Sequence, residues 1–182
     1  MVQMVKMADE AFATGQMPPG YQAIAGYLSS PAAFHPWTRD NWAKFGKVKK
    51  LPIFVSSKAV PGITGTGNSD AFACLEQVYK LGVPKGSAVA LDMETAVDPG
   101  YVTAFSDALN WAGYATWVYG SASSVFGNPQ PKSGGYWVAD YAGIGPFMYN
   151  HAGVRATQYA SGNVFDSSTV KLWQWVNRLK TW

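Results

Sequence analysis

The sequence predicts an α/β fold: a TIM-like (β/α) barrel that is incomplete, with helices missing in its C-terminal third. Short apolar segments alternate with helix-like segments along the first two thirds of the chain, which is typical of parallel strands joined by helices. Residues 88–91 are apolar without alternation, as in a strand covered on both faces. The chain has 182 residues, whereas a complete eight-fold barrel takes about 250. We therefore expect one barrel domain over 1–182 that lacks some helices.

The expected strands are separated by turn signals or helices. They cover 3–9, 21–28, 49–57, 87–94, 114–121, 134–143 and 154–161. The tail 166–182 is ambiguous, because its start alternates like a strand and its end has a helical pattern. In the last third only loops are expected between strands.

Three helices are expected from caps and apolar spacing. Thr38 is a candidate cap for 39–45. Ser69 is expected to cap a helix whose apolar face carries Phe72, Leu75, Val78 and Tyr79. Gly82 and Pro84 would end that helix, and Cys74 inside it is expected to be a small core residue. Asp98 and Pro99 are expected to open the third helix, whose buried stripe would be Tyr101, Val102, Phe105, Leu109 and Ala112.

Composition excludes several functional classes. The net charge of +3 suits an anionic wall polymer but is too small to indicate nucleic acid binding. One cysteine permits no disulfide framework, and His35 and His151 are too isolated for a metal pair or a catalytic dyad. No cofactor or metal is expected. The N-terminus lacks the pattern of a secretory signal and no segment is long enough to span a membrane, so we expect cytoplasmic synthesis and no membrane partner.

Acidic residues stand where several expected strands end. They are Asp9, Asp92, Glu94 and Asp140. In a parallel barrel the carboxyl ends of the strands converge on one face, where active sites lie. Asp92 and Glu94 are two residues apart and so share one face of their strand. Neighbouring carboxylates hinder each other's ionisation, which prepares one as a general acid, as in glycoside cleavage. The alternative is that each caps the turn that follows its strand.

Aromatic residues in or beyond the strands could stack against sugar rings. Tyr119 and Tyr141 stand at strand ends and are the best candidates for the pocket, and Tyr27 is a further one. Core packing is the alternative for these residues. "GITGTG" lacks the ending of a phosphate-binding loop, and "KVKK" with Lys47, Lys49 and Lys50 is interpreted as a solvated turn.

Five segments in order resemble glycoside hydrolase family 25, the lysozyme-type muramidases, and the related Rv2525c-like glycoside hydrolase-like domains. The segments are "GYQAIAGYLSS", "KKLPIFVSS", "DAFACLEQVYKLGVPKGSAVALDMET", "AGYATWVYGSAS" and "GYWVADYAG", followed by "RATQYAS…FDSS". The resemblance implies that Glu94 is the general acid, with Asp92 and Asp9 as its partners. It implies Asp140 and Gln158 as further pocket residues and no metal. The first strand departs from the family, since no Ser follows Asp9.

Two functions follow as expectations. The first is cleavage of the β-1,4 bond between N-acetylmuramic acid and N-acetylglucosamine in peptidoglycan, by an enzyme from a phage or a wall-remodelling system. The second is a barrel without catalysis, which binds a wall glycan or forms part of a larger phage or cell-wall assembly. Release of new reducing ends from walls separates the two.

Overall fold

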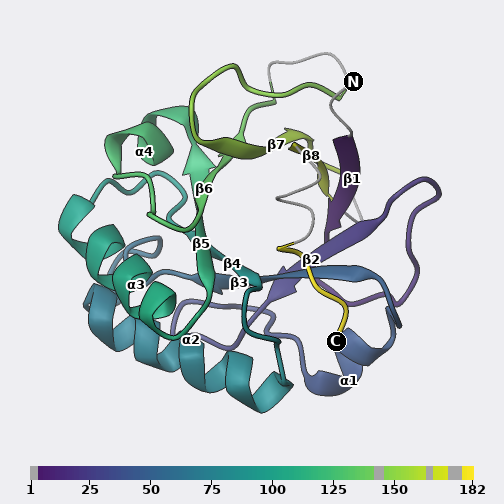
Figure 1. Cartoon of the computed structure of the whole chain (residues 1–182), viewed down its shortest axis with the longest axis horizontal. Coiled ribbons are helices and arrows are strands. Elements are labelled where there is room, and N and C mark those ends of the chain that lie inside the picture. The colour runs from purple at the N-terminus through teal and green to yellow at the C-terminus, as the bar shows by residue number, and fades with distance from the viewer. Residues whose placement is uncertain (1–3, 142–145, 163–165, 172–177) are drawn as a thin grey trace.

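A closed eight-stranded barrel forms the centre of the molecule (Figure 1). The computed structural model describes residues 4–141, 146–162, 166–171 and 178–182. The strands follow one another around the barrel in chain order. They are β1 Met4–Asp9, β2 Ala23–Tyr27, β3 Lys49–Val55, β4 Ala88–Asp92, β5 Ala115–Ser121, β6 Gly135–Ala139, β7 Val154–Ala160 and β8 Asp166–Lys171. The expected TIM-like barrel is therefore confirmed.

The last strand runs against the others. Neighbours from β1 to β7 pair in parallel, but β8 is antiparallel to both β7 and β1. The expectation of a wholly parallel barrel is thus wrong at β8. Only residues 161–165 separate β7 from β8, and a parallel pairing would need a crossover of a dozen residues or more. The short connection leaves antiparallel closure as the available route.

Helices cover one side of the barrel. They are α1 Arg39–Ala43, α2 Gly67–Leu81, α3 Pro99–Trp111 and α4 Ala122–Gly127. In Figure 1 α2, α3 and α4 lie beside β3 to β6, while Trp42 of α1 packs with Ala8 of β1 and Ile24 of β2. Within the described ranges no helix follows β6 or β7. The short helix α4 was not expected, because it follows β5 directly and buries only Ser124 and Val125.

The caps agree with the sequence except in α2. Thr38 caps α1 and Asp98 caps α3 by accepting a hydrogen bond from the Tyr101 amide, as expected. The cap of α2 is Thr66, and Ser69 is the reciprocal partner three residues later in its capping box.

The core face of α2 also differs from the expectation. Leu75 and Val78 are buried, but Phe72 and Tyr79 are 68% and 54% exposed. Cys74 is buried, as expected. Ala71 is also buried, because it lies on the same helix face as Cys74 and Leu75, three and four residues further along. The stripe expected for α3 is buried throughout.

Small and large side chains alternate inside the barrel. Alanines such as Ala25, Ala90 and Ala156 make room for Trp117 and Trp137, and all five are fully buried. The Trp137 ring nitrogen donates to Ser168 Oγ at 3.0 Å. Because side chains fill the interior of the barrel, a pocket can lie only at one of its two ends.

The amino-terminal end of the barrel is crossed by residues 178–182. The amides of Ala88 and Lys50, at the starts of β4 and β3, donate to the carbonyls of Arg178 and Lys180 at 2.8 and 2.9 Å. Lys50 is fully buried there, and its ammonium donates to the Gly46 and Trp182 carbonyls at 2.5 and 3.1 Å. The interpretation of "KVKK" as a solvated turn is therefore wrong for Lys50. None of the described helices combines the length and apolarity that crossing a bilayer requires.

Candidate functional site

Carboxylates from three strands meet at the end of the barrel where the parallel strands finish, here called the mouth. Asp9 is the last residue of β1 and Asp92 the last of β4. Asp166 is the first residue of β8 and pairs directly with Asp9 in the antiparallel register. Because β8 is reversed, its first residue rather than its last lies at the mouth. Asp9 and Asp92 are buried.

Glu94 follows β4 and is held in a strained backbone conformation. Its φ is +49°, the only positive value at a non-glycine position in the described residues. Its amide donates to Asp92 Oδ1 at 3.0 Å, and its carbonyl accepts from the Ser121 amide at 3.0 Å. A Cβ on Gly120 would lie 2.2 Å from that carbonyl oxygen. Strain of this kind persists only where surrounding contacts enforce it, and it is concentrated at functional sites.

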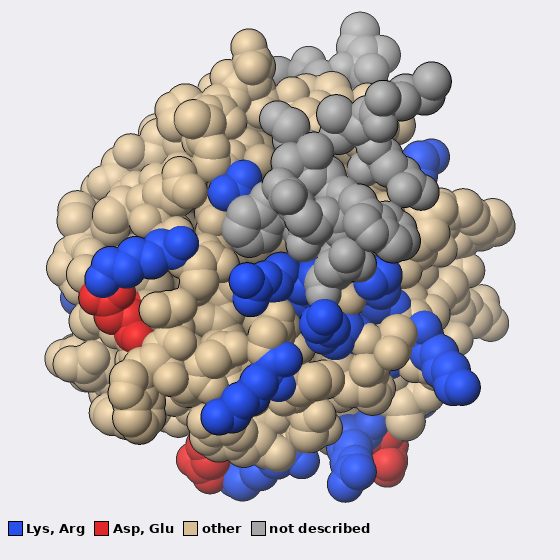
Figure 2. All heavy atoms as spheres, in the orientation of Figure 1, with Lys and Arg blue, Asp and Glu red and all other residues tan. Residues whose placement is uncertain are grey.

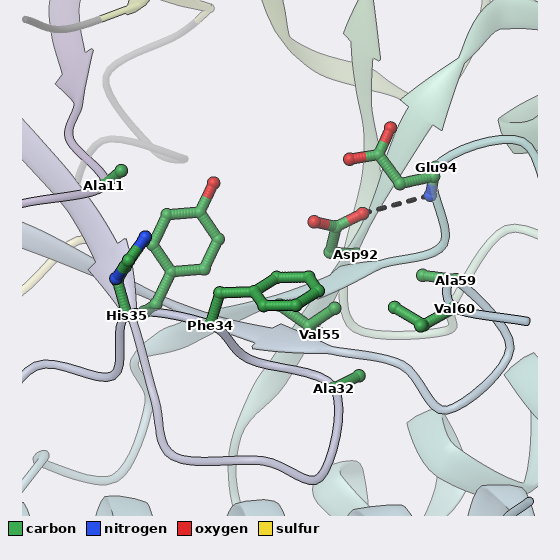
Figure 3. Close-up of a pocket in the computed structure, with 10 residues that line it drawn as sticks. Ala11, Ala32, Phe34, His35, Val55, Ala59, Val60, Asp92 and Glu94 are labelled. Carbon is green, nitrogen blue, oxygen red and sulfur yellow. Dashed lines mark hydrogen bonds between the residues drawn. The ribbon is translucent and has the colours of Figure 1, made fainter. Parts of the chain in front are cut away.

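A pocket of about 320 Å³ opens beside Glu94 and Asp92. Figure 3 shows the two carboxylates on one side of it, Ala11 and His35 from the loops after β1 and β2 on the other, and the Phe34 ring between them. Its remaining wall is mostly apolar and consists of Tyr27, Ala32, Val55, Ala59 and Val60. The pocket therefore combines acids with a wall that can cover the apolar face of a ligand.

The acids at the mouth raise one another's pKa. Burial raises the pKa of Asp9 well above its usual range, and the charges of Asp166, Asp92, Glu10 and Glu94 raise it further. Burial and the charge of Glu94 raise the pKa of Asp92 to about 8, against the opposing hydrogen bond from the Glu94 amide. Burial also raises the pKa of Glu94. Near neutral pH the site thus holds protons that exposed carboxyl groups would have lost.

Two buried tyrosines lie among the carboxylates at the mouth, and Tyr119 is linked to one of them. Burial and the charges of Asp9 and Asp92 raise the pKa of Tyr27, and burial raises that of Tyr119. The Tyr119 hydroxyl donates to Gln158 Oε1 at 2.5 Å, and Gln158 Nε2 donates to Asp166 Oδ2 at 2.6 Å. This chain fixes Asp166 through strands β5 and β7. Tyr141 is 53% exposed and hydrogen-bonds to Tyr119.

Most of the predicted site residues lie together at the mouth, but Asp140 does not. Asp9, Asp92, Glu94, Tyr27, Tyr119 and Gln158 converge at the mouth, with Tyr141 at its edge. Asp140 shares the outward parity of Tyr136 and Val138 on β6 and does not line the pocket. Its part in the site remains a prediction.

Besides the small apolar residues of the pocket wall, Asp166, Phe34 and His35 are site residues that were not predicted. Asp166 lies in the segment "FDSS", which belongs to the family resemblance, so a signal for it existed. Phe34 and His35 lie in the loop after β2, where no periodicity indicates a site, and His35 was considered only as a member of a metal pair or catalytic dyad, for which it is too isolated. Both are exposed at the pocket.

Acidic residues alone do not make this a metal centre. Within the described ranges no group of three or more His, Cys, Asp or Glu side chains is arranged to hold a metal ion. Asp9 Oδ1 is buried and has no hydrogen-bond partner among the described residues. A buried acceptor without a partner is rare in a purely structural role, so it favours a function for Asp9.

The raised pKa of Asp92 predicts how stability depends on pH. The folded state keeps the proton that the unfolded chain loses near pH 4, so the free energy of unfolding falls as the pH rises from about 4 to about 8. Asp92→Asn keeps an oxygen for the Glu94 amide and removes the titration. We expect it to raise the free energy of unfolding by on the order of 3 kcal/mol at pH 7.5 and to leave it unchanged near pH 4.

Urea unfolding of both proteins at pH 4, 6 and 7.5 measures this effect. Asp107→Asn is the control, because its half-exposed carboxylate pairs with Lys132 on the surface and should matter by less than about 1 kcal/mol. Equal stabilities of the Asp92→Asn variant and the original protein at all three pH values would contradict the prediction.

Several solved structures have a fold similar to that of this chain. The structure matches that of an uncharacterized B. stearothermophilus protein with a TM-score of 0.73 and 21% identity, over 96% of this chain and 99% of that one. The likeness is one of fold. No model of a protein family and no curated protein sequence matches the chain.

Two further matches are modular proteins solved with peptidoglycan compounds. The Cpl-1 endolysin, in complex with a peptidoglycan analogue, has a TM-score of 0.66 and 14% identity over 94% of this chain and 55% of its own. The autolysin LytC from Streptococcus pneumoniae, in complex with a synthetic peptidoglycan ligand, has a TM-score of 0.65 and 12% identity over 92% and 46%. This chain thus spans about half the length of each modular protein. At these identities the matches show that the chain shares its fold with both proteins.

Proposed function

We propose that this protein is a glycoside hydrolase that acts on peptidoglycan and cleaves the β-1,4 bond between N-acetylmuramic acid and N-acetylglucosamine. The observation that carries the proposal is the constrained Glu94 beside the buried Asp92 in a pocket of about 320 Å³, with Asp9 and Asp166 across the mouth. The fold shared with an endolysin and an autolysin that were solved with peptidoglycan compounds supports it.

Glu94 is assigned as the general acid. It lines the pocket, and burial raises its pKa, so more of it carries the proton that the leaving sugar oxygen needs. The strained backbone holds the carboxyl group against the pocket, and the hydrogen bond to Asp92 fixes the turn. Breaking the glycosidic bond transfers that proton to the leaving oxygen and leaves Glu94 as a carboxylate. Water then forms the new bond to the anomeric carbon, and the proton it releases restores the acid form of Glu94.

Asp92, Asp9 and Asp166 are assigned to stabilise the transition state. The sugar ring acquires positive charge as the bond breaks. In the free protein, burial and then the charges of the neighbouring acids disfavour ionisation of Asp9 and raise its pKa. A cationic ring between these side chains favours their ionised forms, so the mouth interacts more favourably with the transition state than with the neutral substrate.

Purified cell walls and product analysis test the proposal. We expect the protein to release new reducing ends, with N-acetylmuramic acid at the reducing terminus of each product. Reducing ends on N-acetylglucosamine would contradict the proposed bond. Absence of any new reducing ends from walls that a known muramidase degrades would contradict hydrolysis.

A non-catalytic barrel is the second candidate, favoured by one observation. Asp9 is followed by Glu10 and Ala11 rather than by the Ser of the family pattern. In that case the protein binds wall glycan, alone or within a larger phage or wall assembly, without cleavage. Retention on walls without any reducing ends favours this candidate over the first.

A further inference from the structure

Positive charge gathers at the end of the barrel opposite the mouth. We call this surface the basic face and define it by Lys47, Lys49, Lys85, Arg155, Arg178 and Lys180. The first four precede or open strands β3, β4 and β7, and the last two lie in the segment that crosses the starts of β3 and β4. In Figure 2 the Lys and Arg atoms spread over the visible face, with a few Asp and Glu atoms towards its margin.

The nearby acids do not neutralise this face. Glu76 and Asp107 are engaged by Lys80 and Lys132 at 2.5 and 3.0 Å, outside the set that defines the face. All eleven Asp and Glu residues of the chain lie in the described part. Within that part, Lys47, Lys85, Arg178 and Lys180 form no ion pair with any of them.

The cations crowd one another. Burial and the charge of Lys180 lower the pKa of Lys49. Lys49 donates to the Leu179 carbonyl at 3.2 Å, and Arg178 donates to the Gly86 carbonyl at 3.4 Å. The strands and the crossing segment therefore hold like charges together although each would gain by separation, and an anionic ligand would relieve the repulsion.

We propose that the basic face binds the phosphodiester polymer of the bacterial wall, a chain of polyol phosphate repeats. Such a polymer carries regularly spaced negative charges on a flexible backbone, which separate lysine ammonium groups can contact without a shaped pocket. The choice of a wall polymer rests on the proposed action on peptidoglycan, while the anionic chemistry rests on the charges alone.

The two ends of the barrel then have opposite preferences. The mouth is lined by the acids Asp9, Asp92, Glu94 and Asp166 and offers a polyanion no residue of the basic face, which attracts it. The polymer would thus hold the protein at the wall with the mouth unobstructed for the glycan strand. The net charge of +3 conceals this separation, because acids and bases nearly cancel over the whole chain.

Paired charge removals test the face. Lys47→Gln/Lys85→Gln removes two exposed charges from it. Arg39→Gln/Lys58→Gln is the matched control, because these exposed residues open α1 and follow β3, away from the basic face, and the net charge change is the same. Binding to soluble poly(glycerol phosphate) is measured by calorimetry at 50 and 200 mM salt.

We expect the Lys47/Lys85 variant to weaken binding about fivefold to tenfold at 50 mM salt and the control to change it less than about twofold. The dependence on salt should become shallower in the first variant only. Equal losses in both variants, or no polymer binding by the original protein, would overturn the proposal.

The source of the anion is tested separately. Walls are compared before and after extraction with hydrofluoric acid, which cleaves phosphodiesters, and the bound fraction should fall after extraction. Tighter binding to vesicles containing phosphatidylglycerol or to a single-stranded oligonucleotide than to the polymer, at equal salt, would also overturn the proposal.

These measurements are independent of cleavage. Polymer binding without release of reducing ends contradicts the proposed hydrolase alone. Cleavage without polymer binding contradicts only the role of the basic face.

Discussion

Glu94→Gln is expected to lower the rate of wall cleavage by about 10²- to 10⁴-fold, the usual contribution of a positioned general acid. Gln has nearly the same shape and keeps the backbone hydrogen bonds to Asp92 and Ser121, but its amide cannot give a proton to the leaving oxygen. Release of reducing ends from purified walls, under saturating and limiting substrate, measures the loss.

The pH dependence of the cleavage rate of the original protein is a second test of Glu94 as the general acid. A general acid must be protonated, so the rate falls as the pH rises through the pKa of Glu94, which burial has raised above that of an exposed Glu. Glu76→Gln is the matched control, because Glu76 is an exposed residue of α2 paired with Lys80. Thermal unfolding should be nearly unchanged in both variants. Cleavage by Glu94→Gln at the original rate would remove Glu94 from its assigned role.

Gly120→Ala is expected to damage both the fold and the site. Gly120 has a φ of +154°, and an added Cβ would lie 2.2 Å from the Glu94 carbonyl oxygen and 3.1 Å from Ser124 Oγ. The Glu94 segment must move away, which costs its hydrogen bond to the Ser121 amide and shifts the carboxyl group from the pocket. We expect a loss of about 2–4 kcal/mol in the free energy of unfolding and a fall of about 10²-fold or more in cleavage.

Gly100→Ala is the matched glycine control. It lies in the first turn of α3 without a positive φ, and its added Cβ would meet only Asp98 Oδ1, at 3.7 Å. Alanine in a helix should leave the protein as stable or stabilise it by up to about 1 kcal/mol. Urea unfolding and the wall assay are run on both variants. A Gly120→Ala protein that behaves like Gly100→Ala would show that the clamp on Glu94 is dispensable.

The strands and the long helices could be predicted from the sequence because their signals are local. Continuous apolar runs mark β3 and β4, and Asp98 with Pro99 marks the start of α3. The direction of β8 could not be predicted in this way, because it depends on how strands far apart in the chain close the barrel. The burial of Lys50 depends in the same way on carbonyls supplied by a loop and by residue 182.

In the site, too, the features with a local sequence signal could be predicted and those that depend on distant contacts could not. Asp92 and Glu94 are two residues apart, so strand periodicity alone places them on one face. The pairing of Asp9 with Asp166 joins residues 157 positions apart, and no local pattern indicates it. Phe34 and His35 enter the pocket from a loop, where no periodicity constrains side-chain direction. The separation of the acids at the mouth from the cations of the basic face could not be predicted either, because the net charge of a sequence does not say where its charged residues lie in the fold.

The closure of the barrel by β8 has a consequence for synthesis. Asp9 leaves the ribosome early, but its partner Asp166 arrives only with the final strand, and contacts so distant in sequence form slowly. A growing chain can fold its helical side while the β1 edge is still unpaired and the mouth incomplete. The mouth therefore receives its full set of acids only after β8 has been translated and has paired with β1.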